Sequence, residues 1–131
     1  MIKKIDHIGI AVKSLAQQRT YYEEILGVTC SKTEELAEQK VRIAFFPLGD
    51  VHIELLEPIE ETSPIAKFLR KRGEGIHHIA FQVTDLKGQL LRLEEKNIQL
   101  IDHEPKQGAR GCKIAFLHPS STFGVLTELC E

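Results

Sequence analysis

The sequence predicts an α+β fold built from two βαβββ repeats. The first observation is an internal repeat: IDHIGIAVKSL at 5–15 and IHHIAFQVTDL at 76–86 match at Ile, His, Ile, Val and Leu. The second is that HIELLE at 52–57 and LTELCE at 126–131 share a Glu-Leu-X-Glu core. Two long repeats are too few for a solenoid, so duplication of one unit is the simpler interpretation.

The first half reads as a strand, a helix and three further strands. Apolar and polar residues alternate with period two in the first strand, and Ser14 is a suitable N-cap for a helix that Gly27 ends. Gly49 and Asp50 predict a hairpin between the last two strands, and Pro47 predicts a bulge or an edge. A polar loop is expected at 36–40. The four predicted strands are 5–12, 28–33, 41–48 and 51–57.

A helix that links the halves is predicted at 64–73, with Ser63 as its N-cap and Pro64 in its first turn. The second half repeats the order of the first, with Asp85 as the N-cap of a helix that ends near Asn97. Residues 107–111 are expected to form a flexible loop. We therefore predict one domain over 1–131, with repeat one at about 3–60 and repeat two at about 75–131. The strands expected in the second repeat are 76–83, 113–117 and 125–130.

Composition limits the function classes. The chain has 131 residues, 42% of them apolar and 27% charged, which is typical of an ordinary soluble globular protein. Its net charge of -2 argues against nucleic-acid binding, and no apolar run is long enough to span a membrane. Three cysteines, far apart and without C-x-x-C spacing, argue against a disulfide scaffold. We expect a cytoplasmic protein.

The repeat places four candidate metal ligands at equivalent positions. His7 and His78 lie on the first strand of each half, and Glu54 and Glu128 lie on the last. Two imidazoles and two carboxylates suit one divalent ion such as Zn, Co, Ni or Mn. A single histidine on a strand is more often a packed or surface residue, so spacing alone leaves both interpretations open.

Two further histidines lie beside these candidates. His77 points to the opposite strand face from His78, so we expect a structural role for it. His52 precedes Glu54 by two residues on the same strand face, and we expect it at the surface, with a contact to Glu54 as the alternative.

With these motifs, the chain resembles the vicinal oxygen chelate (glyoxalase/bleomycin resistance/dioxygenase) superfamily, and most closely its methylmalonyl-CoA epimerase family. The resemblance covers nearly the whole chain, and it implies that the two βαβββ repeats form a curved mixed sheet around a central metal site. By position it implies that His7, His78 and Glu128 are metal ligands, with Glu54 where relatives have Gln or Glu. Some epimerases have a catalytic Glu on the preceding strand, where this chain has Ile43. The segments that carry the resemblance are DHIGIAV, YYEEILG, IELLEP, SPIAKFLRKRGEGIHHIAFQV, FLHP and GVLTEL.

The resemblance implies an isomerase that interconverts the 2R and 2S epimers of methylmalonyl-CoA through a metal-stabilised enolate. Glu128 is the first candidate for the catalytic base and Glu54 the second. The family resemblance also implies an acyl-CoA thioester substrate and a homodimer. A glyoxalase I (lactoylglutathione lyase) activity on a glutathione hemithioacetal is the alternative, because bacterial glyoxalase I enzymes share a His, Glu, His, Glu ligand set. A non-catalytic small-molecule-binding member of the superfamily is the third interpretation.

Overall fold

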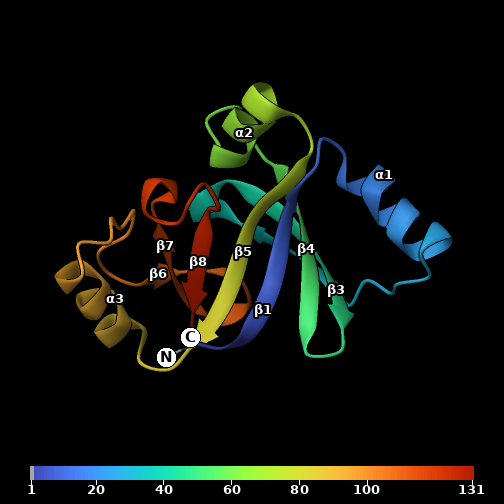
Figure 1. Cartoon of the computed structure of the whole chain (residues 1–131). Helices are drawn as coiled ribbons and strands as arrows, with labels where there is room; N and C mark the ends of the chain where they lie inside the picture. The colour runs from blue at the N-terminus through green and yellow to red at the C-terminus, as the bar shows by residue number, and fades with distance from the viewer. Residues whose placement is uncertain (1) are drawn as a thin grey trace. The chain divides into compact units, whose positions relative to one another are not determined.

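The computed structural model describes residues 2–131 and divides them into two compact units. The first unit comprises residues 7–77, and the second comprises residues 2–6 and 78–131. Eight strands and three α-helices lie within residues 2–131 (Figure 1). The α+β fold class predicted from the sequence is therefore confirmed.

In the first unit the sheet has the strand order β2-β3-β4-β1. β3 is antiparallel to both of its neighbours, whereas β1 is parallel to β4. β1 begins in the second unit, at Ile2, and continues into the first. The elements are β1 (Ile2–Ala11), α1 (Leu15–Thr20), a π-helix (Tyr21–Ile25), β2 (Lys32–Leu36), a 3-10 turn (Ala37–Gln39), β3 (Val41–Leu48), β4 (Val51–Pro58) and α2 (Pro64–Arg72).

The second unit repeats this topology, with the strand order β5-β8-β7-β6. β5 is parallel to β8, and β7 is antiparallel to both β8 and β6, so the order βαβββ occurs twice in the chain. The first residues of β5, up to His77, belong to the first unit. The elements are β5 (Gly75–Val83), α3 (Leu86–Glu95), β6 (Lys106–Gln107), a 3-10 turn (Ala109–Gly111), β7 (Lys113–Leu117), a second 3-10 turn (Pro119–Ser121) and β8 (Thr127–Cys130).

Each unit has its hydrophobic core on one face of its strands, beneath a helix. Because side chains alternate along a strand, the residue next to a core residue points to the other face. Leu55 and Leu129 are core residues, so Glu54 and Glu128 point away from the cores. The buried core residues are Val12, Leu15, Ala44, Phe46 and Leu55 in the first unit, and Val83, Leu86, Leu90, Leu100, Ala115, Leu117 and Leu129 in the second.

The last Glu of the Glu-Leu-X-Glu motif stabilises a helix in each unit. The Leu15 N–H at the start of α1 donates to Glu57 Oε2 at 2.7 Å. The N–H groups of Asp85 and Leu86, at the start of α3, donate to the two carboxylate oxygens of Glu131 at 2.9 and 3.0 Å. The first N–H groups of a helix have no partner within the helix, so these carboxylates satisfy them and oppose the helix dipole. Ser14, Ser63 and Asp85 also cap their helices as predicted.

The structure corrects several predicted boundaries. The first helix is α-helical only to Thr20 and continues as a π-helix. The strand predicted at 28–33 is present but lies later in the chain, because pairing with β3 begins at Lys32 and ends at Leu36, inside the predicted loop. Pro47 lies beyond the last residue that pairs with β2, so its missing N–H breaks no bond on that side.

Residues 107–111, which the sequence predicts to form a flexible loop, contain regular structure instead. The segment contributes Gln107 to β6 and the residues from Ala109 to Gly111 to a 3-10 turn. The left-handed backbone of Arg110, with φ of 55°, lies inside this turn.

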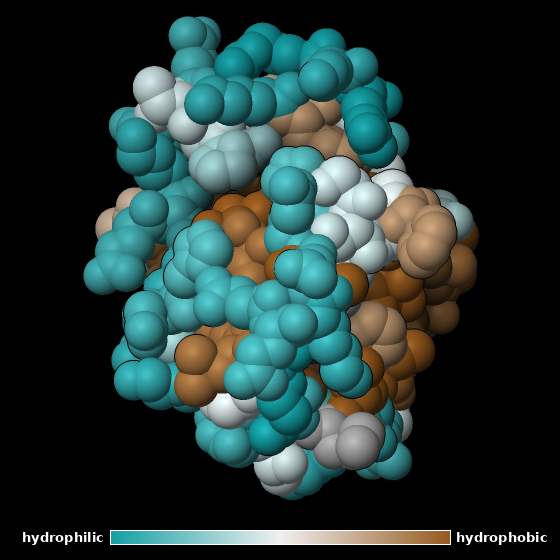
Figure 2. Space-filling view, turned by 60° about the vertical axis from the view of Figure 1, so that its left-hand side comes forward, coloured by the Kyte–Doolittle hydropathy of each residue, from teal (hydrophilic) through white to brown (hydrophobic). Residues whose placement is uncertain are grey.

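The surface combines hydrophilic residues with apolar patches (Figure 2). Exposed large apolar side chains include Ile76, Phe123 and Val125. Within residues 2–131 we find no helix with the length and apolar character needed to cross a membrane.

We expect Glu131→Ala to lower the free energy of unfolding by about 1 kcal/mol, because the first N–H groups of α3 lose their acceptor. Urea denaturation monitored by circular dichroism measures this change. Glu104→Ala is the control, since Glu104 is an exposed carboxylate of the same unit with only a 3.8 Å contact to Lys87. Equal stability of the two variants would contradict the capping role.

The His77 ring packs edge-on against Phe68 of α2, with the ring centroids 5.0 Å apart. Burial lowers the pKa of His77 from 6.5 to about 4. Between these values the unfolded chain binds a proton that the folded chain does not, so stability falls as the pH falls from 6.5 towards 4. We expect the wild type to lose about 2 kcal/mol more than His77→Phe between pH 8 and pH 5, measured by urea denaturation at both pH values. Parallel pH profiles of the two proteins would contradict this.

Candidate functional site

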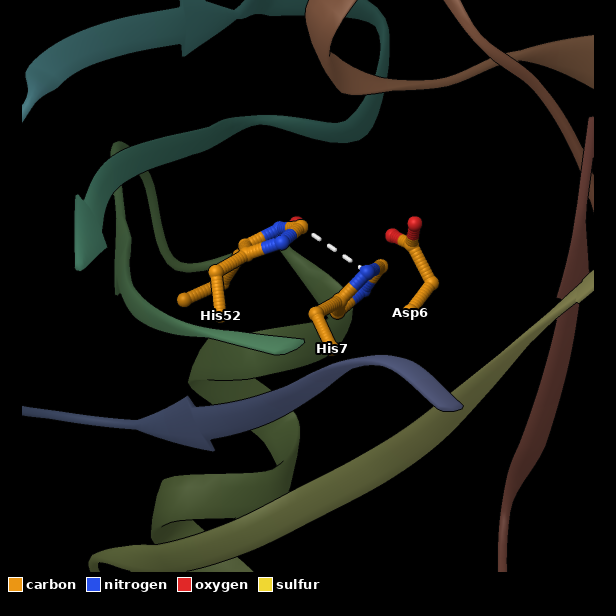
Figure 3. Close-up of side chains that lie close together, drawn as sticks. Asp6, His7 and His52 are labelled. Atoms are coloured by element: carbon orange, nitrogen blue, oxygen red, sulfur yellow. Dashed lines mark hydrogen bonds and ion pairs between the residues drawn. The ribbon is translucent and has the colours of Figure 1, made fainter. Parts of the chain in front are cut away.

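In the first unit, three polar side chains lie on the sheet face opposite the core. His7 of β1 is the register partner of His52 of β4, and Glu54 follows two residues later on β4. His7 and Glu54 are buried, and the side chain of His52 is only 12% exposed. The His7 and His52 rings lie close together, with Asp6 beside them (Figure 3). Parallel pairing of β1 with β4 therefore brings residues from distant parts of the sequence together.

One carboxylate oxygen contacts both imidazoles. Glu54 Oε2 lies 3.2 Å from His7 Nδ1 and 2.7 Å from His52 Nε2. The two ring centroids are 5.0 Å apart, with the planes tilted by 31°. His7, His52 and Glu54 each offer a ligand atom within 4.8 Å of the others. These three residues thus give the first unit a compact set of nitrogen and oxygen donors.

In the second unit, β5 and β8 hold the equivalent pair. His78 Nε2 lies 3.3 Å from Glu128 Oε2, and both residues are buried. The ring of Phe116, the register partner of Glu128 on β7, meets the His78 ring edge-on at 5.4 Å. The structure therefore brings each predicted histidine together with the predicted glutamate of its own unit.

The donor chemistry of both pairs fits a divalent metal ion. Two ligand atoms bound at about 2.1 Å lie roughly 3.0 Å apart in octahedral and about 3.4 Å apart in tetrahedral geometry. The His7–Glu54 and His78–Glu128 contacts of 3.2 and 3.3 Å fall within this range. Buried carboxylates need compensating positive charge or hydrogen bonds, and a cation supplies such charge. Imidazole and carboxylate ligands suit Zn, Co, Ni or Mn.

Position 43, where the family resemblance implies a catalytic Glu in some relatives, is apolar. Ile43 of β3 is buried and pairs with Leu56, and Phe45, two residues later, pairs with Glu54. Register partners share a sheet face, so the Ile43 side chain lies on the same face as Glu54. On β3 and β4, Glu54 is the buried carboxylate of this face.

The structure also places the two remaining histidines. The packing of His77 against Phe68 agrees with the structural role expected from the sequence. The prediction of a surface position for His52 is wrong, because its ring is largely buried and bonded to Glu54. The spacing of two residues on one strand was the sequence signal for that contact.

Sequence reasoning missed an ion pair next to His7. Arg110 Nη2 lies 2.7 Å from Asp6 Oδ2, and the carboxylate of Asp6 is buried. This bond joins the loop before β7 to the start of β1 within the second unit. No local pattern predicts it, because 104 positions separate the two residues.

Both the sequence and the fold are similar to those of known proteins. The model of the Glyoxalase/Bleomycin resistance protein/Dioxygenase superfamily matches residues 6–116. An uncharacterized protein of Bacillus subtilis (strain 168) is 50% identical over 130 residues, which cover 99% of this chain and 93% of that protein.

Two epimerases are also similar. The mitochondrial methylmalonyl-CoA epimerase of Bos taurus is 38% identical over 127 residues, which cover 96% of this chain and 73% of that protein. A solved methylmalonyl-CoA epimerase in complex with methylmalonyl-CoA and NH4+ has a TM-score of 0.95 and 38% identity, and the match covers 99% of this chain and 94% of that one.

Proposed function

Because the chain belongs to the glyoxalase/bleomycin resistance/dioxygenase superfamily, we propose that it is a metal-dependent methylmalonyl-CoA epimerase. Its substrate would then be an acyl-CoA thioester whose 2R and 2S epimers it interconverts. The observation that carries this proposal is the match, at 38% identity and a TM-score of 0.95, to an epimerase in complex with methylmalonyl-CoA. The duplicated His–Glu pairs provide the chemical support.

His7, Glu54, His78 and Glu128 are the proposed ligands of one Co, Mn, Ni or Zn ion. Support comes from the equivalence of the pairs in the repeat and from their similar N–O distances of 3.2 and 3.3 Å. When bound, such an ion polarises the thioester carbonyl and stabilises the negative charge of an enolate.

Epimerisation breaks the C2–H bond on one face of the substrate and forms it on the other. One carboxylate accepts the proton and leaves an enolate, and a second, protonated carboxyl group donates a proton to C2 from the opposite side. Exchange of protons with water then restores both groups. Glu128 is the first candidate base and Glu54 the second. The apolar residue at position 43 supports this role for Glu54, since β3 supplies no carboxylate there.

A glyoxalase I-type activity on a glutathione hemithioacetal is the second candidate. One observation favours it over other functions: Ile43 stands where some epimerases have a catalytic Glu, whereas the His, Glu, His, Glu ligand set is common to both activities and does not separate them. This reaction would use the same ligands and a similar proton transfer. A side-by-side assay with methylmalonyl-CoA and the methylglyoxal–glutathione adduct distinguishes the two activities.

The homodimer and the cytoplasmic location remain predictions from the sequence. The family resemblance supports the homodimer, and so does the strand-rich fold, because sheet edges need cover. Light scattering at micromolar concentration tests it.

We expect chelator treatment to abolish activity and reconstitution to restore it with one divalent ion per chain. His7→Ala and His78→Ala should each weaken metal binding strongly because each removes an imidazole donor, whereas His77→Ala should bind metal normally. Metal analysis by mass spectrometry and the two-substrate assay measure these effects. Full activity in a demonstrably metal-free protein would contradict the proposal, and uptake of two ions would mean that the pairs bind separately.

We expect Glu54→Gln and Glu128→Gln to lose net epimerisation while each still exchanges the C2 proton of one epimer, and these epimers should be opposite. Gln keeps the size of the side chain and an oxygen donor but cannot act as a base. Incorporation of deuterium from D2O into each pure epimer, followed by mass spectrometry, measures the exchange.

Both variants must first be shown to retain the metal, because loss of a ligand would imitate loss of a base. If both metal-loaded variants exchange the same epimer, or if Glu54→Gln epimerises normally, the assignment of Glu54 as the second base is wrong.

A further inference from the structure

The two repeats differ at the residue that precedes the site glutamate by two positions. In the first repeat this residue is His52, and in the second it is Leu126, which has no polar atom in its side chain. His52 lies beside the site histidine of its repeat, as the register partner of His7. Leu126 occupies the corresponding place, since its carbonyl accepts the Ile79 N–H next to His78, at 3.2 Å. The repeat therefore supplies an imidazole at one site glutamate and an aliphatic side chain at the other.

The contact of His52 with Glu54 has the length of a hydrogen bond. Its N–O distance is 2.7 Å, whereas the two His–Glu pairs of the proposed metal site measure 3.2 and 3.3 Å. A nitrogen and an oxygen bound to one ion lie roughly 3.0–3.4 Å apart, and a charge-assisted N–H···O bond measures about 2.7–2.9 Å. An ionised carboxylate only accepts, so the contact requires the proton of His52 on Nε2. His52 thus donates to Glu54.

Packing holds the His52 ring in place. The ring lies 5.9 Å from the ring of Phe45, and 5.0 Å from that of His7, by centroid distance. Its side chain is only 12% exposed, and it extends from a strand that pairs on both sides. A donor with so little freedom fixes the position of its acceptor, because little entropy is lost when the bond forms.

We propose that His52 is a positioning residue that orients the Glu54 carboxylate towards the metal by donating a hydrogen bond to Oε2. The carboxylate keeps further lone pairs with which it can bind an ion. Hydrogen-bond partners of metal ligands typically change metal affinity 10- to 100-fold when they are removed. This inference rests on the metal site of the proposed function, but it does not depend on the identity of the substrate.

The alternative is that His52 itself binds the metal, in place of a bond to Glu54. The two roles differ in what a substitute must offer. A positioning residue can be replaced by any donor of similar reach, whereas a ligand must offer a basic nitrogen. The amide of Gln provides an N–H near the position of His Nε2 but no basic nitrogen. Gln at this position therefore separates the roles.

The experiment measures the dissociation constant for Co2+ by competition with a chelator, without substrate. We expect His52→Leu, which introduces the residue of the second repeat, to bind Co2+ roughly 10- to 100-fold more weakly than the wild type. His52→Gln should stay within about threefold of the wild type, because the donor is retained. His103→Leu is the matched control, since it also breaks a contact between a His and a Glu, here Glu94, but at an exposed place. It should bind Co2+ like the wild type.

Three results would overturn the inference. The first is an unchanged affinity for Co2+ in His52→Leu. The second is an equal loss of affinity in His52→Leu and His52→Gln, which would make His52 a metal ligand. The third is that the wild type does not bind Co2+. Thermal unfolding checks that the variants are folded. If His52→Leu is unfolded, His52→Phe replaces it, because Phe keeps a ring against Phe45 and lacks the donor. Metal binding by the wild type without epimerase activity would reject the proposed function and leave the inference intact.

Discussion

Parallel pairing between the first and the last strand of each unit is the interaction on which the candidate site depends. It aligns His7 with the Glu54 strand in one unit and His78 with the Glu128 strand in the other. Neither pair is close in sequence, and both are buried. Side chains alternate along the last strand, so one face contributes to the core and the other to the candidate site. Leu55 and Leu129 pack beneath the helices, whereas the preceding residues, Glu54 and Glu128, face away from the cores. The proposed chemistry therefore uses residues whose placement is fixed by the same hydrogen bonds that build the sheets.

The two glutamates of the proposed site have different surroundings despite their equivalent positions. Glu54 accepts a hydrogen bond from His52, and the corresponding residue near Glu128 is Leu126. The strand beside Glu54 also has Ile43 where some related epimerases have a carboxylate. Both features belong to the first repeat, and the equivalent of the His52 imidazole in the second repeat is the aliphatic side chain of Leu126.

Much of the fold could be predicted because its signals are local. Period-two strands such as β5, and helix caps such as Ser63, depend on neighbours within a few residues. The internal repeat also gave long-range information, because it showed that His7 and His78 occupy equivalent positions in the two halves of the chain. The bounds of β2 could not be predicted, because pairing with β3 sets them rather than composition. The ion pair of Arg110 with Asp6 joins residues that no motif connects. The spacing of His52 to Glu54 could be read from the sequence. Its burial could not, because the covering of that strand face depends on the tertiary structure.

The carboxylates that cap α1 and α3 have an evolutionary consequence. Glu57 and Glu131 follow the site glutamates by three residues, so one short strand segment encodes both a proposed ligand and the anchor of the nearby helix. A single ancestral gene segment for one unit would already have contained the sheet, the core, the helix cap and a His–Glu pair. Duplication of such a segment would give both units without any new structural element. The two present repeats differ at a few positions, of which His52 with its counterpart Leu126 is the clearest example, while both have the capping glutamate.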